Sequence, residues 1–214
     1  MEEKKKFIGF YNYTVILTYI GMITGLLGIT LVMNEAFYGA ALALMISGLC
    51  DMFDGAIAST KERSESEKYF GIQIDSLSDL ICFGVLPGFF LYKSCGETKL
   101  SLMISCFYIL CALVRLAYFN VMETERQSVE SGRRKVYQGL PVTAIALILP
   151  ALLILDRIVP IDLITVFRLV MCVTAIAFII QVKIKKPGRA GKILLVLAGA
   201  AEFAVLLASG AGLI

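Results

Sequence analysis

The chain has 214 residues, of which 58% are hydrophobic, and its formal net charge is only +3. This apolar share exceeds the roughly 45–50% of soluble domains, and it is gathered in runs of about 20 residues, the length that a helix needs to cross a bilayer. The composition therefore argues against a soluble protein and predicts an all-α, polytopic transmembrane helical bundle with no nucleic-acid partner.

The apolar runs follow one another along the whole chain, separated by short polar segments. We interpret them as one integral membrane domain, residues 1–214, with six core spans between about residues 13 and 182 and an additional C-terminal helix at about 190–213. The predicted spans are residues 13–33, 37–58, 70–92, 100–121, 140–155 and 161–182, with the seventh run at 193–213.

The positive charges lie mainly in alternate connecting segments. If all seven runs cross the membrane, fifteen of the 20 Lys and Arg residues fall on the side of the N-terminus: three in Lys4–Lys6, three in 59–69, four in 122–138 and five in 183–192. Short cytoplasmic loops carry such an excess of Lys and Arg. The distribution predicts a multi-pass protein of the cell membrane with a cytoplasmic N-terminus.

Four aspartates near one predicted loop are the main candidates for chemistry. Asp51 and Asp54 are spaced i,i+3 at the end of the second run, and Asp75 and Asp79 are spaced i,i+4 near the start of the third. Either spacing places both carboxylates on one face of a helix. Carboxylates held close together repel unless they are protonated or bridged by cations, and oxygen ligands suit Mg²⁺ or Mn²⁺. The four aspartates are therefore a candidate site for such a divalent ion.

Two simpler interpretations compete with a metal site. Each aspartate could be an ordinary residue at a helix end, but two pairs able to face each other favour a functional site, because acids in membrane helices are costly. The acids could also form the ion pathway of a cation transporter. Transporters place such sites at mid-membrane between repeated halves, whereas these acids cluster at one predicted face without a second set.

The acids lie within a longer pattern of small and acidic residues. Seven positions match, in order, the motif D-x-x-D-G-x-x-A-R-x8-G-x3-D-x3-D, and they are Asp51, Asp54, Gly55, Ala58, Gly71, Asp75 and Asp79. The chain thereby resembles the CDP-alcohol phosphatidyltransferase family. It departs from the motif in two ways, since Ser59 replaces the arginine and 12 residues rather than nine separate Ala58 from Gly71. Lys61 or Arg63 could replace the missing arginine.

The resemblance implies a reaction in which a small alcohol attacks the β-phosphorus of a CDP-linked lipid and CMP leaves. It implies that the four aspartates hold one or two divalent ions, Mg²⁺ or Mn²⁺, that Asp79 is the catalytic base, and that Gly55, Ala58 and Gly71 line the CDP site. Thr18 resembles a family position near the nucleotide. The resemblance also implies a homodimer with six core helices. The sequence has no histidine, which agrees with a carboxylate as the base.

Three segments of the second half resemble the phosphatidylserine synthase branch of the family. They are Phe83-Gly84-x-x-Pro87, the stretch from Arg115 to Asn120, and Gly139-Leu140-Pro141. Arg115 and Asn120 are candidates for substrate binding, because an arginine can hold a carboxylate or phosphate through two hydrogen bonds. The alternative for Arg115 is a side chain that extends to the interface.

The sequence thus predicts phosphatidyl transfer from CDP-diacylglycerol to L-serine, which yields phosphatidylserine and CMP. The alternatives are the same reaction with glycerol 3-phosphate, an inositol phosphate or inositol, and the cation transporter.

Overall fold

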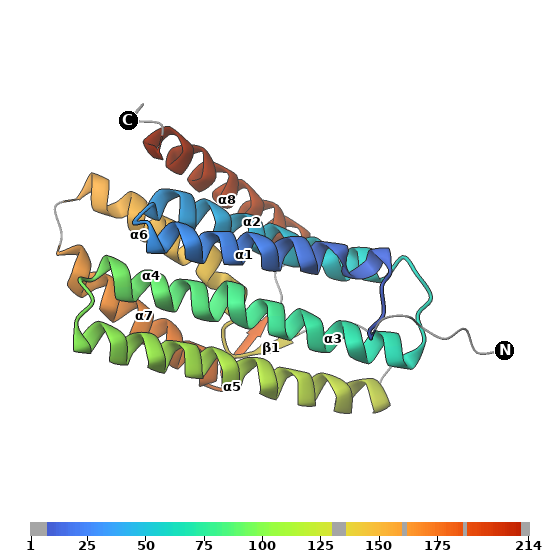
Figure 1. The fold of residues 1–214 in the computed structure, drawn as a ribbon. Helices are drawn as coiled ribbons and strands as arrows, with labels where there is room; N and C mark the ends of the chain where they lie inside the picture. Colours follow the sequence, from blue (N-terminus) through green and yellow to red (C-terminus); the bar gives the residue numbers. More distant parts are fainter. Residues whose placement is uncertain (1–7, 130–135, 160–161, 186–187, 211–214) are drawn as a thin grey trace.

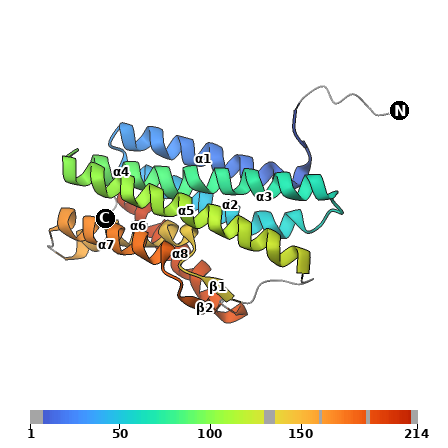
Figure 2. The ribbon, with the colours of Figure 1, turned by 90° about the horizontal axis from the view of Figure 1, so that it is seen from below.

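The computed structural model describes residues 8–129, 136–159, 162–185 and 188–210 as a bundle of long helices that run roughly along a common axis (Figure 1). The α-helices are α1 (Ile16–Met33), α2 (Phe37–Ala58), α3 (Glu65–Asp79), α4 (Leu86–Ser94), α5 (Lys99–Val129), α6 (Ile145–Ile158), α7 (Leu163–Ile179) and α8 (Arg189–Gly210). Short helical turns are η1 (Tyr13–Val15), η2 (Leu80–Val85) and η3 (Val142–Ala144). Two three-residue strands, β1 (Val136–Gln138) and β2 (Lys183–Lys185), pair antiparallel near the lower edge of the view in Figure 2.

The helices confirm the predicted all-α membrane architecture. Within the described residues, five helical stretches are long and apolar enough to cross a bilayer: Tyr13–Met33, Phe37–Ala58, Glu65–Ser94, Lys99–Glu125 and Ile193–Gly210. The predicted fifth and sixth spans correspond to shorter helices, α6 with 14 residues and α7 with 17. Large apolar side chains of α1 and α5 lie exposed on the outside of the bundle, as expected where a helix faces lipid.

The third span begins earlier than predicted. The sequence suggested a loop over 59–69 because this segment is charged, but helix α3 already starts at Glu65. Ser64 and Glu67 form a capping box, in which each side chain binds the backbone N–H of the other residue. This arrangement satisfies two N–H groups at the start of the helix. Asp75 and Asp79 therefore lie in the last turns of α3 rather than in the first turns of a span.

Helix α5 is longer than the predicted fourth span. It continues to Val129, where the sequence suggested a loop from Met122. The segment Met122–Val129 contains neither glycine nor proline, so nothing in its composition ends the helix. Two basic clusters, Lys4–Lys6 and Arg133–Lys135, lie outside the described residues.

Aromatic side chains fill the part of the bundle that is distant from the acids. Phe90 of α4 contacts both Phe37 of α2 and Phe167 of α7, with ring centroids 5.1 and 5.7 Å away. Phe37 begins α2 and lies 14 residues before Asp51, a separation of about 21 Å along a helix. The aromatic part of the core thus lies well along the bundle from the acids.

Arg168 of α7 holds the turn between α4 and α5. Its guanidinium donates hydrogen bonds to the Cys95 carbonyl (3.0 Å), to Thr98 Oγ1 (2.9 Å) and to Ser101 Oγ (2.9 Å). These groups lie at the end of one helix and the start of the next, where backbone groups lack partners within the helix. Arg168 is therefore a structural residue that joins α7 to this turn.

Helix η2 is a π-helical segment that joins α3 directly to α4, so residues Glu65–Ser94 form one continuous helix. Single π turns within α-helices often occur at functional sites. This one starts at the residue after Asp79. Tyr108 of α5 is fully buried, and its hydroxyl donates a 2.8 Å hydrogen bond to the Phe83 carbonyl in the middle of the segment.

Tyr108→Phe is expected to destabilise the protein by about 1–2 kcal/mol, because it removes the hydroxyl that a buried carbonyl accepts from. For a chain of this size, that change lowers the midpoint of thermal unfolding in detergent by roughly 2–8 °C. Tyr92→Phe is the matched control, since the Tyr92 hydroxyl has no hydrogen bond in the described part of the chain. Equal midpoints for the two variants would show that the bond to Phe83 contributes nothing.

Candidate functional site

Helices α2 and α3 bring the acids together from two sides. One carboxylate oxygen from each of Asp51, Asp54 and Asp75 lies within 4.8 Å of the others, and all three residues are partly buried. Asp79 lies outside this group of three but lines the same small inner cavity. The spacing argument from the sequence thus brings all four acids to one place, with Asp79 set apart from the closest group.

Helix α1 packs closely against η2 and α4, which continue the acid-bearing helix α3. Gly21, Gly25 and Gly28 lie on one face of α1. A Cβ atom at Gly25 would lie 2.6 Å from Cys82 Sγ, and one at Gly28 would lie 2.8 Å from a methyl group of Leu86. Small residues spaced in this way let membrane helices pack backbone to backbone. The sequence analysis overlooked this glycine face, although its small-residue spacing is visible in the sequence.

Hydrogen bonds to α1 carbonyls set the positions of α2 and α3. Ser47 of α2 donates to the Gly21 carbonyl (2.9 Å), and Ser78 of α3 donates to the Thr18 carbonyl (3.3 Å). Both serines are buried and lie next to the acids in their helices. The carboxylates are therefore held on a framework of three helices rather than on a loop.

A larger cavity of about 220 Å³ opens beside the acid group. It brings together the four residues predicted to contact the nucleotide, Thr18, Gly55, Ala58 and Gly71, together with Asp54 and Asp75. Its remaining lining residues are Thr14, Val15, Arg63, Lys68 and Ile72. Lys68 was missed by the sequence analysis, although it precedes Gly71 by three residues and so shares its helix face.

Thr18 links the cavity to the acids. Its hydroxyl donates a 3.3 Å hydrogen bond to Asp54 Oδ2, and a hydrogen bond to one oxygen leaves the other free to bind a ligand. Apart from atoms of its own helix turn, no atom of the described residues lies within 4 Å of the place where a side chain of Gly55 would begin, so this wall of the cavity is open.

Two predicted site residues line neither cavity. Asn120 of α5 accepts a 2.8 Å hydrogen bond from Ser76, the residue after Asp75. Arg115 is buried, donates through Nε to the Leu140 carbonyl (3.3 Å), and lies over the ring of Phe119. Asn120 thus connects α5 to α3 beside Asp75, and Arg115 contacts the segment that leads into α6.

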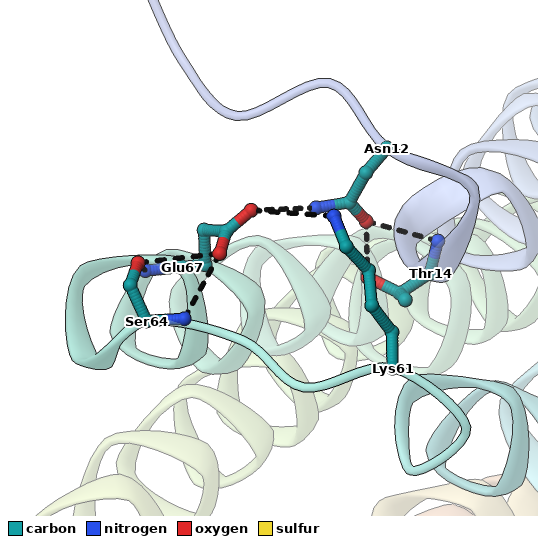
Figure 3. A network of polar contacts seen from close by, with 5 residues as sticks. All are labelled: Asn12, Thr14, Lys61, Ser64 and Glu67. Atoms are coloured by element: carbon teal, nitrogen blue, oxygen red, sulfur yellow. Dashed lines mark hydrogen bonds and ion pairs between the residues drawn. The ribbon is translucent and has the colours of Figure 1, made fainter.

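A polar network lies beside the cavity, where the segment before α1 meets the loop between α2 and α3 (Figure 3). Asn12 Oδ1 accepts from the backbone N–H of Thr14 (3.0 Å), and Asn12 Nδ2 donates to Glu67 Oε1 (3.1 Å). Lys61 Nζ lies 3.6 Å from the same Glu67 oxygen, and Ser64 completes the network through the capping box. The loop is thereby tied to the N-terminal segment.

Comparison with known protein families identifies the chain. Residues 11–161 match the family model described as CDP-alcohol phosphatidyltransferase. The chain belongs to the CDP-alcohol phosphatidyltransferase family. The matched region contains every residue of the acid group and of both cavities, and it gives no support to the transporter alternative.

Named relatives refine the family assignment. The chain is 34% identical to CDP-diacylglycerol–serine O-phosphatidyltransferase of Saccharomyces cerevisiae over 146 residues, which cover 67% of this chain and 48% of that protein. It is 29% identical to archaetidylserine synthase of Methanothermobacter thermautotrophicus (68% and 59% covered) and 30% identical to CDP-diacylglycerol–serine O-phosphatidyltransferase of Bacillus subtilis (61% and 70% covered). The aligned part thus spans about half the length of the first two relatives.

The acid group is suited to a metal ion. Members of this family generally depend on a divalent metal, and Asp51, Asp54 and Asp75 offer three carboxylate oxygens close enough to share one ion. A donor set made only of oxygen fits hard cations such as Mg²⁺ and Mn²⁺. The residues present therefore fit the group that the family requires.

Proposed function

We propose that this protein transfers a phosphatidyl group from CDP-diacylglycerol to L-serine and releases CMP. The main support is the convergence of the motif residues, because those predicted to bind the nucleotide line one cavity directly beside three grouped carboxylates. The named relatives that act on serine support the choice of acceptor.

In the proposed reaction, the serine hydroxyl oxygen forms a bond to the β-phosphorus of CDP-diacylglycerol. The bond between that phosphorus and the oxygen bridging to CMP breaks, and CMP leaves with the electron pair. Asp79 accepts the proton of the attacking hydroxyl. It is assigned this role because it lines the inner cavity but lies outside the group of three acids.

Asp51, Asp54 and Asp75 would hold the divalent ion, which neutralises phosphate charge and stabilises the leaving group. Thr18 orients Asp54 through its hydrogen bond. The open wall at Gly55, with Ala58 and Gly71, leaves room for the nucleotide. The substrate would thus occupy the outer cavity, with the carboxylates of the inner cavity beside it.

The proposal includes the placement of the protein in the cell membrane. The site opens beside the loop that carries Lys61 and Arg63, and the excess of Lys and Arg on this side of the membrane supports a cytoplasmic active site. We also propose, from the family resemblance, that the chain forms a homodimer in which helices up to α7 make the catalytic core and α8 is an addition.

Incubation of the purified protein with CDP-diacylglycerol, Mg²⁺ or Mn²⁺, and a panel of alcohols tests this function. We expect CMP release with L-serine at least about tenfold faster than with glycerol 3-phosphate, inositol or inositol phosphate, a margin of about 1.4 kcal/mol in activation free energy. An Asp79→Asn preparation purified in parallel controls for contaminating enzymes. Release with glycerol 3-phosphate but not serine would refute the acceptor, and no release with any alcohol would refute the enzyme.

A further inference from the structure

Lys61 and Arg63 could each replace the arginine absent at Ser59, and the structure shows that their contacts differ. The Ser59 hydroxyl donates to the Ala56 carbonyl (2.7 Å) at the end of α2. Lys61 is engaged by Glu67. Arg63 instead lines the cavity, and its Nη1 atom would lie 3.1 Å from a Cβ at Gly71.

Among the residues that the structure describes, none is a partner for the charge of Arg63. Its side chain is partly buried, and in the part of the chain that the structure describes it forms no hydrogen bond and no ion pair. Lys68, the other cation of the cavity, donates a 2.7 Å hydrogen bond to Glu65 and is therefore already paired. Arg63 is thus the cavity cation that remains available to an anion.

Two hydrogen bonds of the network in Figure 3 position Arg63. Glu67 accepts one from the Ser64 backbone N–H (2.9 Å) and one from Asn12 Nδ2 (3.1 Å). Ser64 directly follows Arg63, so these contacts hold the backbone beside Arg63 against both α3 and the segment before α1. Between Ala58 and Gly71, where the chain is three residues longer than the motif, Arg63 thus lies over Gly71.

The cavity lining therefore includes two carboxylates and a guanidinium that has no partner among the described residues. A guanidinium binds phosphate through two parallel hydrogen bonds, and a diphosphate can meet a metal and an arginine together. We propose that Arg63 binds the diphosphate of the CDP-linked lipid in place of the arginine absent at Ser59, and that Glu67 is its positioning residue. This inference rests on the proposed function, because it takes that substrate as the ligand.

Equilibrium binding of CDP-diacylglycerol to the full chain in detergent micelles with Mg²⁺ tests the role of Arg63. We expect Arg63→Gln to weaken binding about tenfold or more, because a charge-assisted contact is lost, and Arg63→Lys to fall between this variant and the wild type. Lys61→Gln is the matched control from the same loop and changes affinity by less than about threefold, because its ion pair is partly exposed. Unchanged thermal unfolding midpoints show that the variants are folded.

Two further variants test whether Arg63 replaces the arginine absent at Ser59 and whether Glu67 positions Arg63. Ser59→Arg should leave the affinity for CDP-diacylglycerol unchanged within about twofold, since the loop already supplies the contact. Glu67→Ala should weaken binding in the wild type but add nothing to Arg63→Gln, because it acts through Arg63. A clear gain from Ser59→Arg, or full additivity of Glu67→Ala and Arg63→Gln, would overturn the proposal.

The outcomes for Arg63 and for the proposed function differ. Wild-type affinity in Arg63→Gln, an equal loss in Lys61→Gln, or a wild-type protein that does not bind CDP-diacylglycerol would each overturn the role of Arg63. If Arg63→Gln weakens binding but the wild type transfers the phosphatidyl group to no alcohol, the phosphate contact stands and the proposed function fails.

Discussion

Asp79→Asn is expected to reduce the turnover rate with L-serine by about 10²–10⁴-fold, the usual contribution of a general base. The substitution preserves the shape of the side chain but removes its ability to take a proton. Since Asp79 lines the inner cavity without belonging to the closest acid group, the variant should still bind CDP-diacylglycerol within about threefold of the wild type, a difference of less than about 1 kcal/mol.

The measurement compares kcat from CMP release with the dissociation constant for CDP-diacylglycerol in the same preparation. Asp156→Asn, at an exposed acid near the end of α6, is the matched control and should keep both values. If Asp79→Asn turned over at a near-normal rate, another group would be the base. If it lost CDP-diacylglycerol binding together with turnover, Asp79 would belong to the metal site instead.

Removal of divalent metal is expected to abolish activity, leaving less than about 1% of the initial rate, because a metal can supply several kcal/mol of charge stabilisation to the transition state. Without a cation, the grouped carboxylates of Asp51, Asp54 and Asp75 repel one another and an incoming diphosphate. Addition of Mg²⁺ or Mn²⁺ after chelation should restore the rate.

The metal titration also tests which residues hold the ion. Asp75→Asn removes one of three close ligands, so the Mg²⁺ concentration that gives half of the maximal rate should rise about tenfold or more, the scale of a lost charged contact. Mg²⁺ should also raise the thermal unfolding midpoint of the wild type more than that of Asp75→Asn, because a ligand stabilises the state that binds it. Asp156→Asn again serves as the control. Full activity after exhaustive chelation would refute metal dependence.

The sequence alone was sufficient for the features that depend on local patterns. Apolar runs of about 20 residues identify helices able to cross a membrane because the length of such a helix is set by the bilayer. The spacing of Asp51 with Asp54, and of Asp75 with Asp79, predicts shared faces because the helical repeat is constant. The Ser64–Glu67 capping box was also present in the sequence, but the charged segment around it suggested a loop.

Contacts between segments far apart in the sequence could not be predicted from local patterns. The hydrogen bond of Tyr108 to the π-helical segment joins residues 25 positions apart, and the bonds of Arg168 to the turn between α4 and α5 join residues 67–73 positions apart. A buried polar group is satisfied by whatever lies next to it in space. Only the packed bundle therefore identifies Arg168 as a structural residue and places Arg115 against Leu140 rather than in the lining of the two cavities beside the acids.

In the acid site, too, some features follow from the sequence and others only from the tertiary structure. The residue types and the helical period determined that four carboxylates could meet and that a hard metal would suit them. The tertiary structure decided that the glycine face of α1 packs against η2 and α4, and that three of the four carboxylates lie close enough to share an ion. It also distinguished Lys61 from Arg63 as the cation available to a phosphate. Glu67 forms an ion pair with Lys61 and a hydrogen bond with Asn12, 55 positions before it in the sequence, whereas Arg63 lines the cavity.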